Sequence, residues 1–359
     1  MEALAVMKNY KSDLYVIVNL SGGGGRAKRT YARVREILLK NGVDFKTFAS
    51  RYPGDVKLFV EKLTDRVDGI INLAVVGGDG TINEVINGIK DFSRTRVGVI
   101  PTGSGNDFAR GLGLPKDTDK AVGRILKCLA ADNMIPGEEY TQDCNSCVVR
   151  QIDVGLTTVY GDENVALQLG KAVGVTSLQR RFGISSGIGL DALVCKKVDN
   201  SRIKGFMNRL GFGGLSYIVM TVISLFTMEQ NDVKLVYSAE DCVDARCEQK
   251  IDKLIFFAAM NMRCEGGGVP MAPKADYSDG ELSCTLAHGV PKWKSFFILP
   301  ILVMAKHEKV KCFKLFNDKK VELFSNKEMV VHIDGEYGGE SKHVSFEVLP
   351  EKMVVMTGR

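Results

Sequence analysis

The chain has 359 residues, of which 45% are hydrophobic and 25% are charged, an ordinary balance for a globular protein. This length is enough for two domains and a substantial core. The formal net charge of +5 does not indicate a nucleic-acid partner, although it is compatible with an anionic membrane surface or a phosphorylated ligand.

The cysteines and the N-terminus favour a cytoplasmic protein. Nine cysteines show no paired framework, and the first residues lack an apolar core followed by a small-residue cleavage site. We therefore expect reduced thiols. Cys144 and Cys147 have the spacing of a metal pair, but no second Cys or His pair at zinc spacing accompanies them, which favours incidental thiols.

The first third of the chain alternates between strand and helix patterns. Strands are expected at 14–20, 44–50, 70–76 and 97–100, and helices at 27–41, 54–64 and 81–89. Repeated βα units predict a doubly wound α/β nucleotide-binding domain over residues 1–140. Its ligand loops should lie at the carboxyl ends of the parallel strands.

The turn after the third strand is the most informative segment, Gly77-Gly78-Asp79-Gly80-Thr81. Glycines that join a strand to a helix N-terminus let backbone N–H groups approach a phosphate. A carboxylate beside phosphates is repulsive unless a cation bridges them or it binds a ribose hydroxyl. The turn therefore predicts a nucleotide with a metal ion, and phosphoryl transfer.

A second loop supports this interpretation. Pro101-Thr102-Gly103-Ser104-Gly105-Asn106-Asp107 follows the fourth strand with small polar residues suited to phosphate binding. Asp153 lies on an apolar strand, where a carboxylate is costly unless it is paired or binds a cation. The chain contains no P-loop motif, and the Gly77 turn does not match the dinucleotide fingerprint.

The second half of the chain is dominated by short strand patterns. They are expected at 148–154, 187–195, 233–238, 253–260, 280–286, 321–325, 329–333 and 344–348. These predict an antiparallel β-sandwich domain over residues 141–344, with one helical insertion near 205–227. Residues 345–359, which contain a terminal strand at 353–356, are expected to return to the first domain.

Two apolar stretches, 215–228 and 296–305, are too short to span a bilayer. We interpret each first as a core helix, with an amphipathic face that touches a membrane as the alternative. The basic cluster at 306–314 is interpreted as a solvated face, with anionic-lipid contact as the alternative.

Two acidic turns complete the candidate site. The first contains Asp276, Asp279 and Glu281 and is either an Asx turn before a hairpin or a hard-cation site. The second, His332-Ile333-Asp334-Gly335-Glu336, ends an apolar strand. Glu336 is a candidate general base, and His332 is interpreted as a residue that only flanks the turn.

The Gly77–Gly88 segment, the 101–110 segment with Asn106-Asp107-Phe108-Ala109-Arg110, and the late Asp334-Gly335-Glu336 together resemble the diacylglycerol kinase catalytic-domain family, in particular its bacterial lipid kinases. NAD kinases and phosphofructokinases share the glycine turn alone. Sphingosine kinases usually carry another residue where Asp107 stands.

The resemblance implies ATP and Mg²⁺ as cofactors. By it, ATP would contact Asn19, Ser21, Gly22, Gly23, Ser50, Gly77, Gly78, Asp79, Gly80, Thr81, Asn83 and Ser104. It further implies that Asp79, Asp107 and Asp153 form a carboxylate–water–Mg²⁺ network and that Asp276, Asp279 and Glu281 form a structural Mg²⁺ turn. Glu336 would accept the substrate proton.

The chain departs from the family pattern at the first phosphate loop, which reads Asn19-Leu20-Ser21-Gly22-Gly23 with its nearest bases at Arg26 and Lys28. The stretch 157–182 is also longer than usual for the family.

The sequence therefore predicts an ATP- and Mg²⁺-dependent lipid kinase that acts on diacylglycerol at a membrane surface, with transient membrane association. The alternatives are a kinase of phosphatidylglycerol, a monoacylglycerol or a sphingoid base, an NAD kinase, and a nucleotide- or lipid-binding regulator without turnover. The sequence is also compatible with a homodimer.

Overall fold

The computed structural model describes residues 14–20, 25–130, 149–161, 177–200, 224–225, 227–238 and 246–358. The chain divides into two compact units, residues 1–152 with 351–359, and residues 153–350. Each unit has its own sheet and its own hydrophobic core, so each is described by itself.

The first unit is built on a six-stranded sheet in the order β2-β1-β3-β4-β16-β5, of which all pairs are parallel except β16–β5. Its strands are β1 (Leu14–Val18), β2 (Phe45–Ala49), β3 (Ile71–Gly77), β4 (Thr95–Pro101), β5 (Val149–Ile152) and β16 (Met353–Met356). Every residue of β1 and β3 is buried, as expected for central strands with both faces covered.

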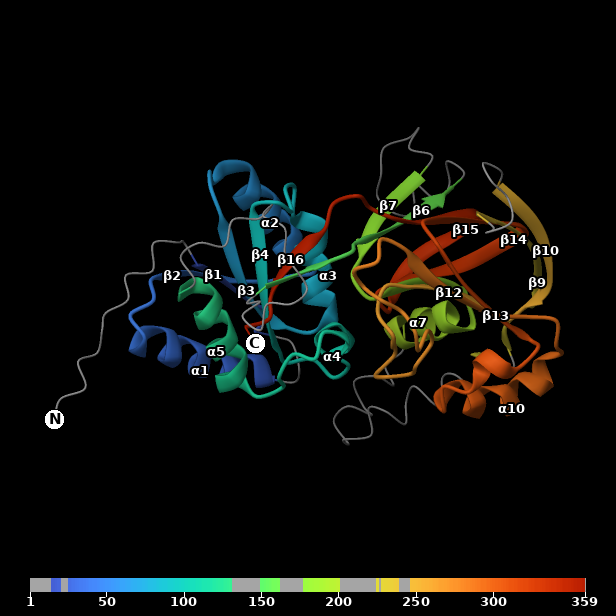
Figure 1. The fold of residues 1–359 in the computed structure, drawn as a ribbon, viewed down its shortest axis with the longest axis horizontal. Coiled ribbons are helices and arrows are strands. Elements are labelled where there is room, and N and C mark those ends of the chain that lie inside the picture. The colour runs from blue at the N-terminus through green and yellow to red at the C-terminus, as the bar shows by residue number, and fades with distance from the viewer. Residues whose placement is uncertain are drawn as a thin grey trace. The chain divides into compact units, whose positions relative to one another are not determined.

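Helices cover both faces of this sheet (Figure 1). They are α1 (Arg26–Lys40), α2 (Asp55–Arg66), α3 (Asp79–Gly88), the short α4 (Asp107–Gly111) and α5 (Thr118–Ala130). α1 packs with α5, and α2 packs with α3. The strand order reverses between β1 and β3, and the crevice outside such a reversal is where doubly wound sheets bind ligands.

The second unit is an antiparallel sheet domain with strands in the order β13-β12-β11-β8-β14-β15-β6-β7, and with β9 paired to β14 and β10 paired to β9. Its strands are β6 (Gly155–Tyr160), β7 (Ser177–Phe182), β8 (Ser185–Gly189), β9 (Asn231–Ser238), β10 (Arg246–Leu254), β11 (Phe256–Met260), β12 (Leu282–Ala287), β13 (Phe313–Asp318), β14 (Lys320–Ile333) and β15 (Glu336–Val348).

The long strand β14 gives this domain its two layers. Its first part pairs with β9 at 322–325, its last part pairs with β8 at 331–333, and its register with β15 shifts between Phe324 and Met329. One core of buried side chains from both branches lies between them, including Leu235, Phe257 and Phe346. The predicted fold class, an α/β domain followed by an antiparallel β-sandwich domain, is therefore confirmed.

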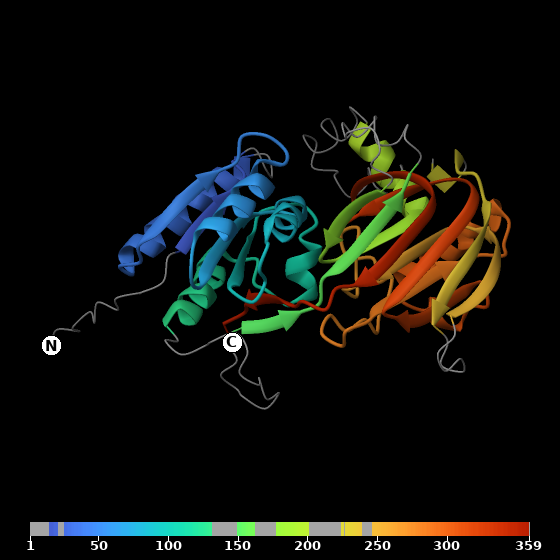
Figure 2. The same ribbon diagram turned by 90° about the horizontal axis from the view of Figure 1, so that it is seen from above.

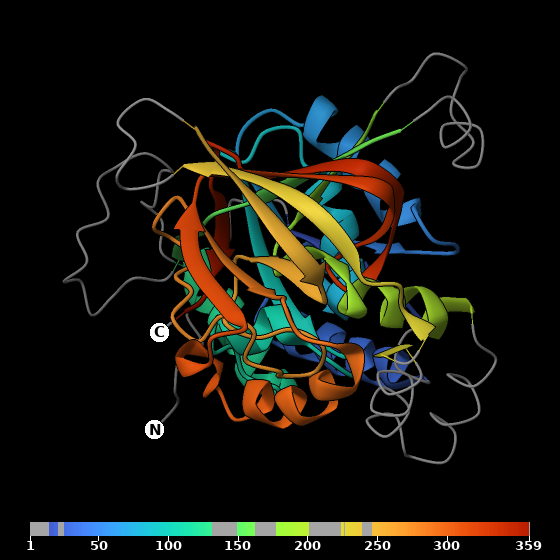
Figure 3. The ribbon, with the colours of Figure 1, turned by 90° about the vertical axis from the view of Figure 1, so that its right-hand side faces the viewer.

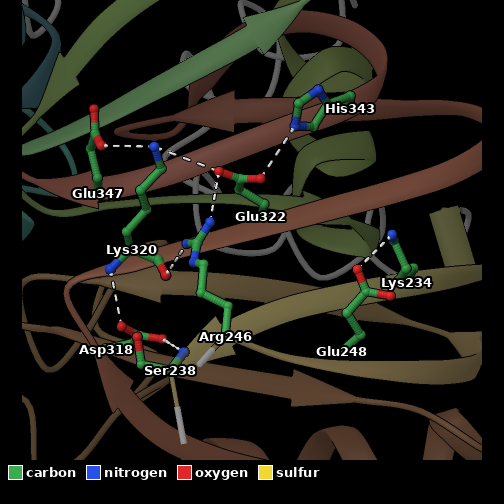
Figure 4. Close-up of polar contacts among 9 residues, drawn as sticks. All are labelled: Lys234, Ser238, Arg246, Glu248, Asp318, Lys320, Glu322, His343 and Glu347. Carbon is green, nitrogen blue, oxygen red and sulfur yellow. Dashed lines mark hydrogen bonds and ion pairs between the residues drawn. The ribbon is translucent and has the colours of Figure 1, made fainter. Parts of the chain in front are cut away.

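Ion pairs join the strands at the β14 branch (Figure 4). Glu322 accepts a hydrogen bond from Arg246 (3.0 Å) and lies 3.5 Å from the Lys320 ammonium, which is also 3.5 Å from Glu347. Burial acts to raise the pKa of Glu322, but these cations outweigh it and hold the pKa below its usual range. This network ties β10 and β15 to opposite sides of β14.

Three expected elements differ in the structure. The expected strand at 187–195 ends at Gly189 and continues as helix α7 (Leu190–Asn200), because Gly189 turns the chain at φ 103°. The expected strands at 321–325 and 329–333 are one strand, β14. The apolar stretch at 296–305 lies in helix α10 (Lys292–Val303), but this helix is not a core helix, because only Ser295 and Leu302 of it are buried. The 205–227 insertion and the 215–228 stretch fall largely outside the described residues.

The division between the units differs slightly from the expected boundaries at 140 and 344. β5 pairs with β16 at 353–356, so the first unit extends to Ile152 (Figure 2). β15 runs to Val348 within the second sheet, so only residues after Pro350 return to the first unit. The register of hydrogen-bonded strands decides both boundaries.

Candidate active site

The loops predicted to bind a nucleotide meet at one edge of the first sheet. Val18 at the end of β1 is in register with Ala49 of β2 and Val76 of β3, and Gly77 is in register with Pro101 of β4. The residues that follow these strand ends include Asn19, Ser50, Asp79 and Ser104. These residues are far apart in the sequence but lie at the same edge of the sheet, because the carboxyl ends of parallel strands share that edge. Ser21, Gly22 and Gly23 lie outside the described residues.

Two glycines let the loops after β3 and β4 touch. A Cβ atom built on Gly78 would lie 3.0 Å from the Cα atom of Gly103, and one built on Gly103 would lie 2.8 Å from the Cα atom of Gly78. Contacts this short against backbone cannot be relieved by a rotamer change. Thr102 N–H also donates to Gly77 O at 2.9 Å. The two loops therefore form one surface.

Asp79 connects these loops through its carboxylate. Its two oxygens accept hydrogen bonds from the N–H groups of Asp107 and Phe108, both at 3.1 Å, at the N-terminus of α4. Burial raises the pKa of Asp79, whereas these N–H donors and the Arg110 charge act in the opposite direction. Asp79 is thus a helix cap as well as a candidate metal-network residue.

Asp107 is buried beside Asp79. Its carboxylate pairs with Arg110, and Arg110 also donates to Gly105 O at 2.9 Å. Asn106 has a left-handed conformation, with φ 52°, and bonds to both the N–H and the O of Gly103. Ser104, at the tip of the loop, is exposed. The loop thus presents Ser104 to solvent on a frame that internal hydrogen bonds fix.

The first turn of α3 supplies further donors. Its N–H groups at Gly80 and Thr81 belong to the positions that have no partner within a helix. Thr81 and Asn83 are buried, and Asn83 accepts a hydrogen bond from Asn87. Glu84 accepts hydrogen bonds from Val56 and Lys57 N–H and so caps α2. The backbone, rather than the Thr81 or Asn83 side chain, is therefore the better-placed phosphate donor here.

In the second unit, Asp334 and Gly335 form a hairpin turn with φ values of 49° and 78°. The Asp334 carboxylate is buried and accepts hydrogen bonds from Gly183, Ile184 and Ser185 N–H at 3.0, 2.8 and 3.1 Å. Asp334 therefore anchors the turn and is not available for chemistry.

Glu336 begins β15 directly after this anchored turn. Its side chain is 44% exposed, and its carboxylate pairs with Arg180 of β7. A half-exposed carboxylate on a rigid hairpin is able to accept a proton from a hydroxyl. Arg180 is a site residue that the sequence did not reveal, since it lies 156 positions from Glu336 in the stretch 157–182, where no strand or helix was expected.

The 276–281 turn gathers carboxylates in the second unit. The Asp153 carboxylate accepts a hydrogen bond from Gly280 N–H at 2.8 Å, and Asp153 N–H donates to Tyr277 O at 2.7 Å. Burial raises the pKa of Asp279, and the charges of Asp276 and Asp153 raise it further. Asp276 and Asp279 accept hydrogen bonds from the N–H groups of Ser278 and Glu281, both at 3.0 Å, so the segment forms the expected Asx turns. The repulsion among its carboxylates is the kind that a hard cation would relieve.

His332 has a larger role than a residue that flanks a turn. Its Nε2 atom lies 3.1 Å from Asp191 Oδ2 and 3.9 Å from Glu265 Oε2, a spacing that could admit a cation. Here Nε2 bonds directly to Asp191, so the group is an ion-pair cluster. Burial opposes the charged ring, but Asp191, Glu265 and Asp334 outweigh it and raise the pKa of His332 to about 9.

Comparison with known proteins agrees with this architecture. Residues 13–132 match the diacylglycerol kinase catalytic domain, and residues 184–357 match the YegS C-terminal NAD kinase beta sandwich-like domain. A diacylglycerol kinase catalytic domain followed by this sandwich places the chain in the class of lipid kinases. Residues 13–132 therefore form a domain of the diacylglycerol kinase catalytic-domain family, and a kinase domain of this family implies the use of ATP.

Curated relatives span nearly the whole chain. A putative lipid kinase, YtlR, of Bacillus subtilis is 24% identical over 331 residues, which cover 91% of this chain and 94% of the relative. A diacylglycerol kinase of Staphylococcus carnosus is 25% identical and covers 90% of this chain and 89% of its own. The fold is also similar to the crystal structure of a putative diacylglycerol kinase from Bacillus anthracis, with a TM-score of 0.64 at 19% identity over 96% of this chain and 97% of that one.

Proposed function

We propose that the chain transfers the γ-phosphate of ATP to a hydroxyl of a membrane lipid, with diacylglycerol as the first candidate and phosphatidic acid as the product. Glu336 carries this proposal, because it is a half-exposed carboxylate on a hairpin that Asp334 holds in place. The curated relatives named diacylglycerol kinase favour this acceptor over other lipids.

The loops of the first unit would hold the triphosphate. N–H groups of the Gly78–Thr81 turn and the exposed Ser104 hydroxyl would bind phosphate oxygens, and Asp79 keeps the two loops together. A bound Mg²⁺ would supply positive charge near Asp153 and the 276–281 turn. Catalysis of phosphoryl transfer rests mainly on positioning and charge neutralisation, and the Glu336 carboxylate would take up the hydroxyl proton.

A labelling assay tests the proposal. The protein is incubated with γ-labelled ATP, Mg²⁺ and mixed micelles that contain diacylglycerol, monoacylglycerol, phosphatidylglycerol or a sphingoid base. We expect label in phosphatidic acid, and a loss of about 100-fold or more in the Glu336→Gln variant. Glu340→Gln is the matched control, since Glu340 lies on the same strand and also pairs with a cation, Lys196.

Each other outcome has a definite meaning. Label in a different lipid corrects the acceptor. Equal labelling by Glu336→Gln and the wild type removes Glu336 as the base. ATP binding without label in any lipid supports a non-catalytic regulator in place of a kinase.

A further inference from the structure

The helix α10 of the second unit exposes an apolar surface that the proposed phosphoryl transfer does not use. Ten large hydrophobic side chains are exposed in the described part of the chain, and five of them belong to this helix and the residue after it: Trp293, Phe296, Phe297, Val303 and Met304. Trp293 is 60% exposed and Phe297 is 66% exposed. Single exposed hydrophobic residues are common, but a cluster of this size marks an interaction site.

The helical period gathers these residues on one side of α10. Positions 293, 296, 297, 300 and 304 recur at spacings of three and four residues, so they form one stripe. The opposite side attaches the helix to its domain, through buried Ser295 and Leu302 and through Ile298 and Leu299 packed on the core. α10 therefore has two apolar sides, of which one is covered. Figure 3 shows this helix (orange) at the periphery of its unit.

Lysines flank the exposed stripe. Lys292 and Lys294 project roughly 100° to either side of Trp293, and the Lys294 ammonium lies 5.4 Å from the centre of the Trp293 ring system. Exposed Lys306, Lys309 and Lys311 follow the helix. Residues 292–311 hold five lysines and one acid, Glu308, which pairs with Lys274 at 2.7 Å. The surface is both apolar and positively charged.

We propose that this stripe of α10 is a membrane-docking surface that inserts Trp293, Phe296 and Phe297 at the headgroup level of a bilayer containing anionic lipids. The inference rests on the proposed function, since a lipid acceptor must be collected from a bilayer. Aromatic rings favour the membrane interface, and Lys side chains beside them gain from negative headgroups. A protein partner would not need this excess of lysine around an aromatic stripe.

The described helices include none long and apolar enough to cross a membrane. Docking through α10 would thus be peripheral and reversible, driven by a few side chains and by charge.

The chain provides its own reporter, because Trp293 is its single tryptophan. The full-length protein is titrated with vesicles of phosphatidylcholine, with and without phosphatidylglycerol, while the emission of Trp293 is recorded. We expect a blue shift and quenching by brominated acyl chains with the anionic vesicles, and a much weaker response with phosphatidylcholine alone or at high salt.

The variant Phe296→Ser/Phe297→Ser retains the reporter and should weaken vesicle binding roughly 100-fold. Leu39→Ser/Leu58→Ser is the matched control, since these two side chains are exposed to a similar extent on helices of the first unit. It should bind vesicles like the wild type. Thermal unfolding of both variants checks that they fold.

Three results would overturn the proposal. One is sedimentation with vesicles while Trp293 emission stays unchanged, which would place the membrane contact elsewhere. Another is the absence of binding to either vesicle. The third is a blue shift that grows with protein concentration without vesicles, which would assign the stripe to a second copy of the chain.

A separate assay distinguishes failure of docking from failure of the proposed function. With a short-chain, water-soluble diacylglycerol, the Phe296→Ser/Phe297→Ser variant should phosphorylate as fast as the wild type, while it loses activity on vesicle-embedded substrate. Activity on neither form by the wild type would remove the proposed lipid kinase reaction, and the vesicle titration would still decide docking.

Discussion

Three carboxylates that look similar in the sequence have different roles at the level of single residues. Asp79 caps α4, Asp334 anchors a hairpin through three backbone N–H groups, and Glu336 is half-exposed. The difference lies in the donors that surround each group. A carboxylate whose oxygens are occupied by backbone donors holds structure, and one open to solvent is available to a substrate.

Replacement of Asp334 by Ala should cost about 3 kcal/mol of folding free energy, because three buried N–H groups lose a charged acceptor. Glu336→Gln should leave stability nearly unchanged and lower activity about 100-fold or more. Urea unfolding of the two variants, alongside the labelling assay, measures both. Equal stability of Asp334→Ala and the wild type would contradict the anchoring role.

Asp79→Asn should lower stability by about 1 kcal/mol and weaken ATP binding, since an amide cannot accept both the Asp107 and the Phe108 hydrogen bonds. Asp65→Asn, at an exposed pair with Lys90, is the control and should change neither quantity. Calorimetric titration with ATP and denaturant unfolding provide the readings. The interpretation fails if the two variants behave alike.

The His332 cluster makes stability depend on pH. The folded-state pKa of about 9 lies above the ordinary value for an unfolded chain, so the stabilisation is complete below about pH 6.5 and is lost as the pH rises through 9. His332→Gln, which leaves Asp191 and Glu265 without this cation, should cost about 3 kcal/mol at pH 6. Melting curves from pH 6 to 10 should show the two proteins converging at high pH.

At the level of elements, the geometry of the candidate nucleotide site depends on the contact between the 77–81 and 101–107 loops rather than on the composition of either loop. Gly103→Ala would place a Cβ 2.8 Å from the backbone of Gly78 and push the two loops apart, so ATP binding should weaken about tenfold or more. Gly123→Ala is the control, because a Cβ there meets no atom within 4 Å in helix α5. That change should slightly stabilise the protein and spare ATP binding. Unaltered ATP affinity in Gly103→Ala would contradict this account.

Elements with a strong apolar periodicity and clear end signals are predicted correctly from the sequence. The elements that they pair with or pack against cannot be predicted in this way. The strand at 353–356 and the helix near 27–41 are visible as short apolar or periodic runs. The change from strand to helix at Gly189 is hidden, because 187–195 carries apolar residues compatible with either. The exposure of α10 is hidden for the same reason, since an apolar helix looks alike whether or not a partner covers it.

At the level of the whole molecule, the chain crosses between its units twice, after Ile152 and after Pro350. β16 lies between β4 and β5, and all four of its residues are buried. A chain ending at Pro350 should therefore lose cooperative unfolding of the first unit and become sensitive to proteolysis between residues 14 and 130. Limited proteolysis of the shortened and full chains, followed by mass analysis, measures this. Equal resistance would show that β16 is dispensable.

The glycine turn at 77–81, the loop at 101–107 and the late Asp334-Gly335-Glu336 turn are predictable from sequence alone, because backbone freedom, strand ends and turn chemistry are local properties. The same motifs carry the resemblance to the diacylglycerol kinase catalytic-domain family, which residues 13–132 match. The three-dimensional fold is needed to show which acids are capped, that Arg180 pairs with Glu336, that Asp153 bonds to the 276–281 turn, and that His332 lies between Asp191 and Glu265. These contacts join residues far apart in the chain, and their energies depend on burial and on neighbouring charge, which no local pattern encodes.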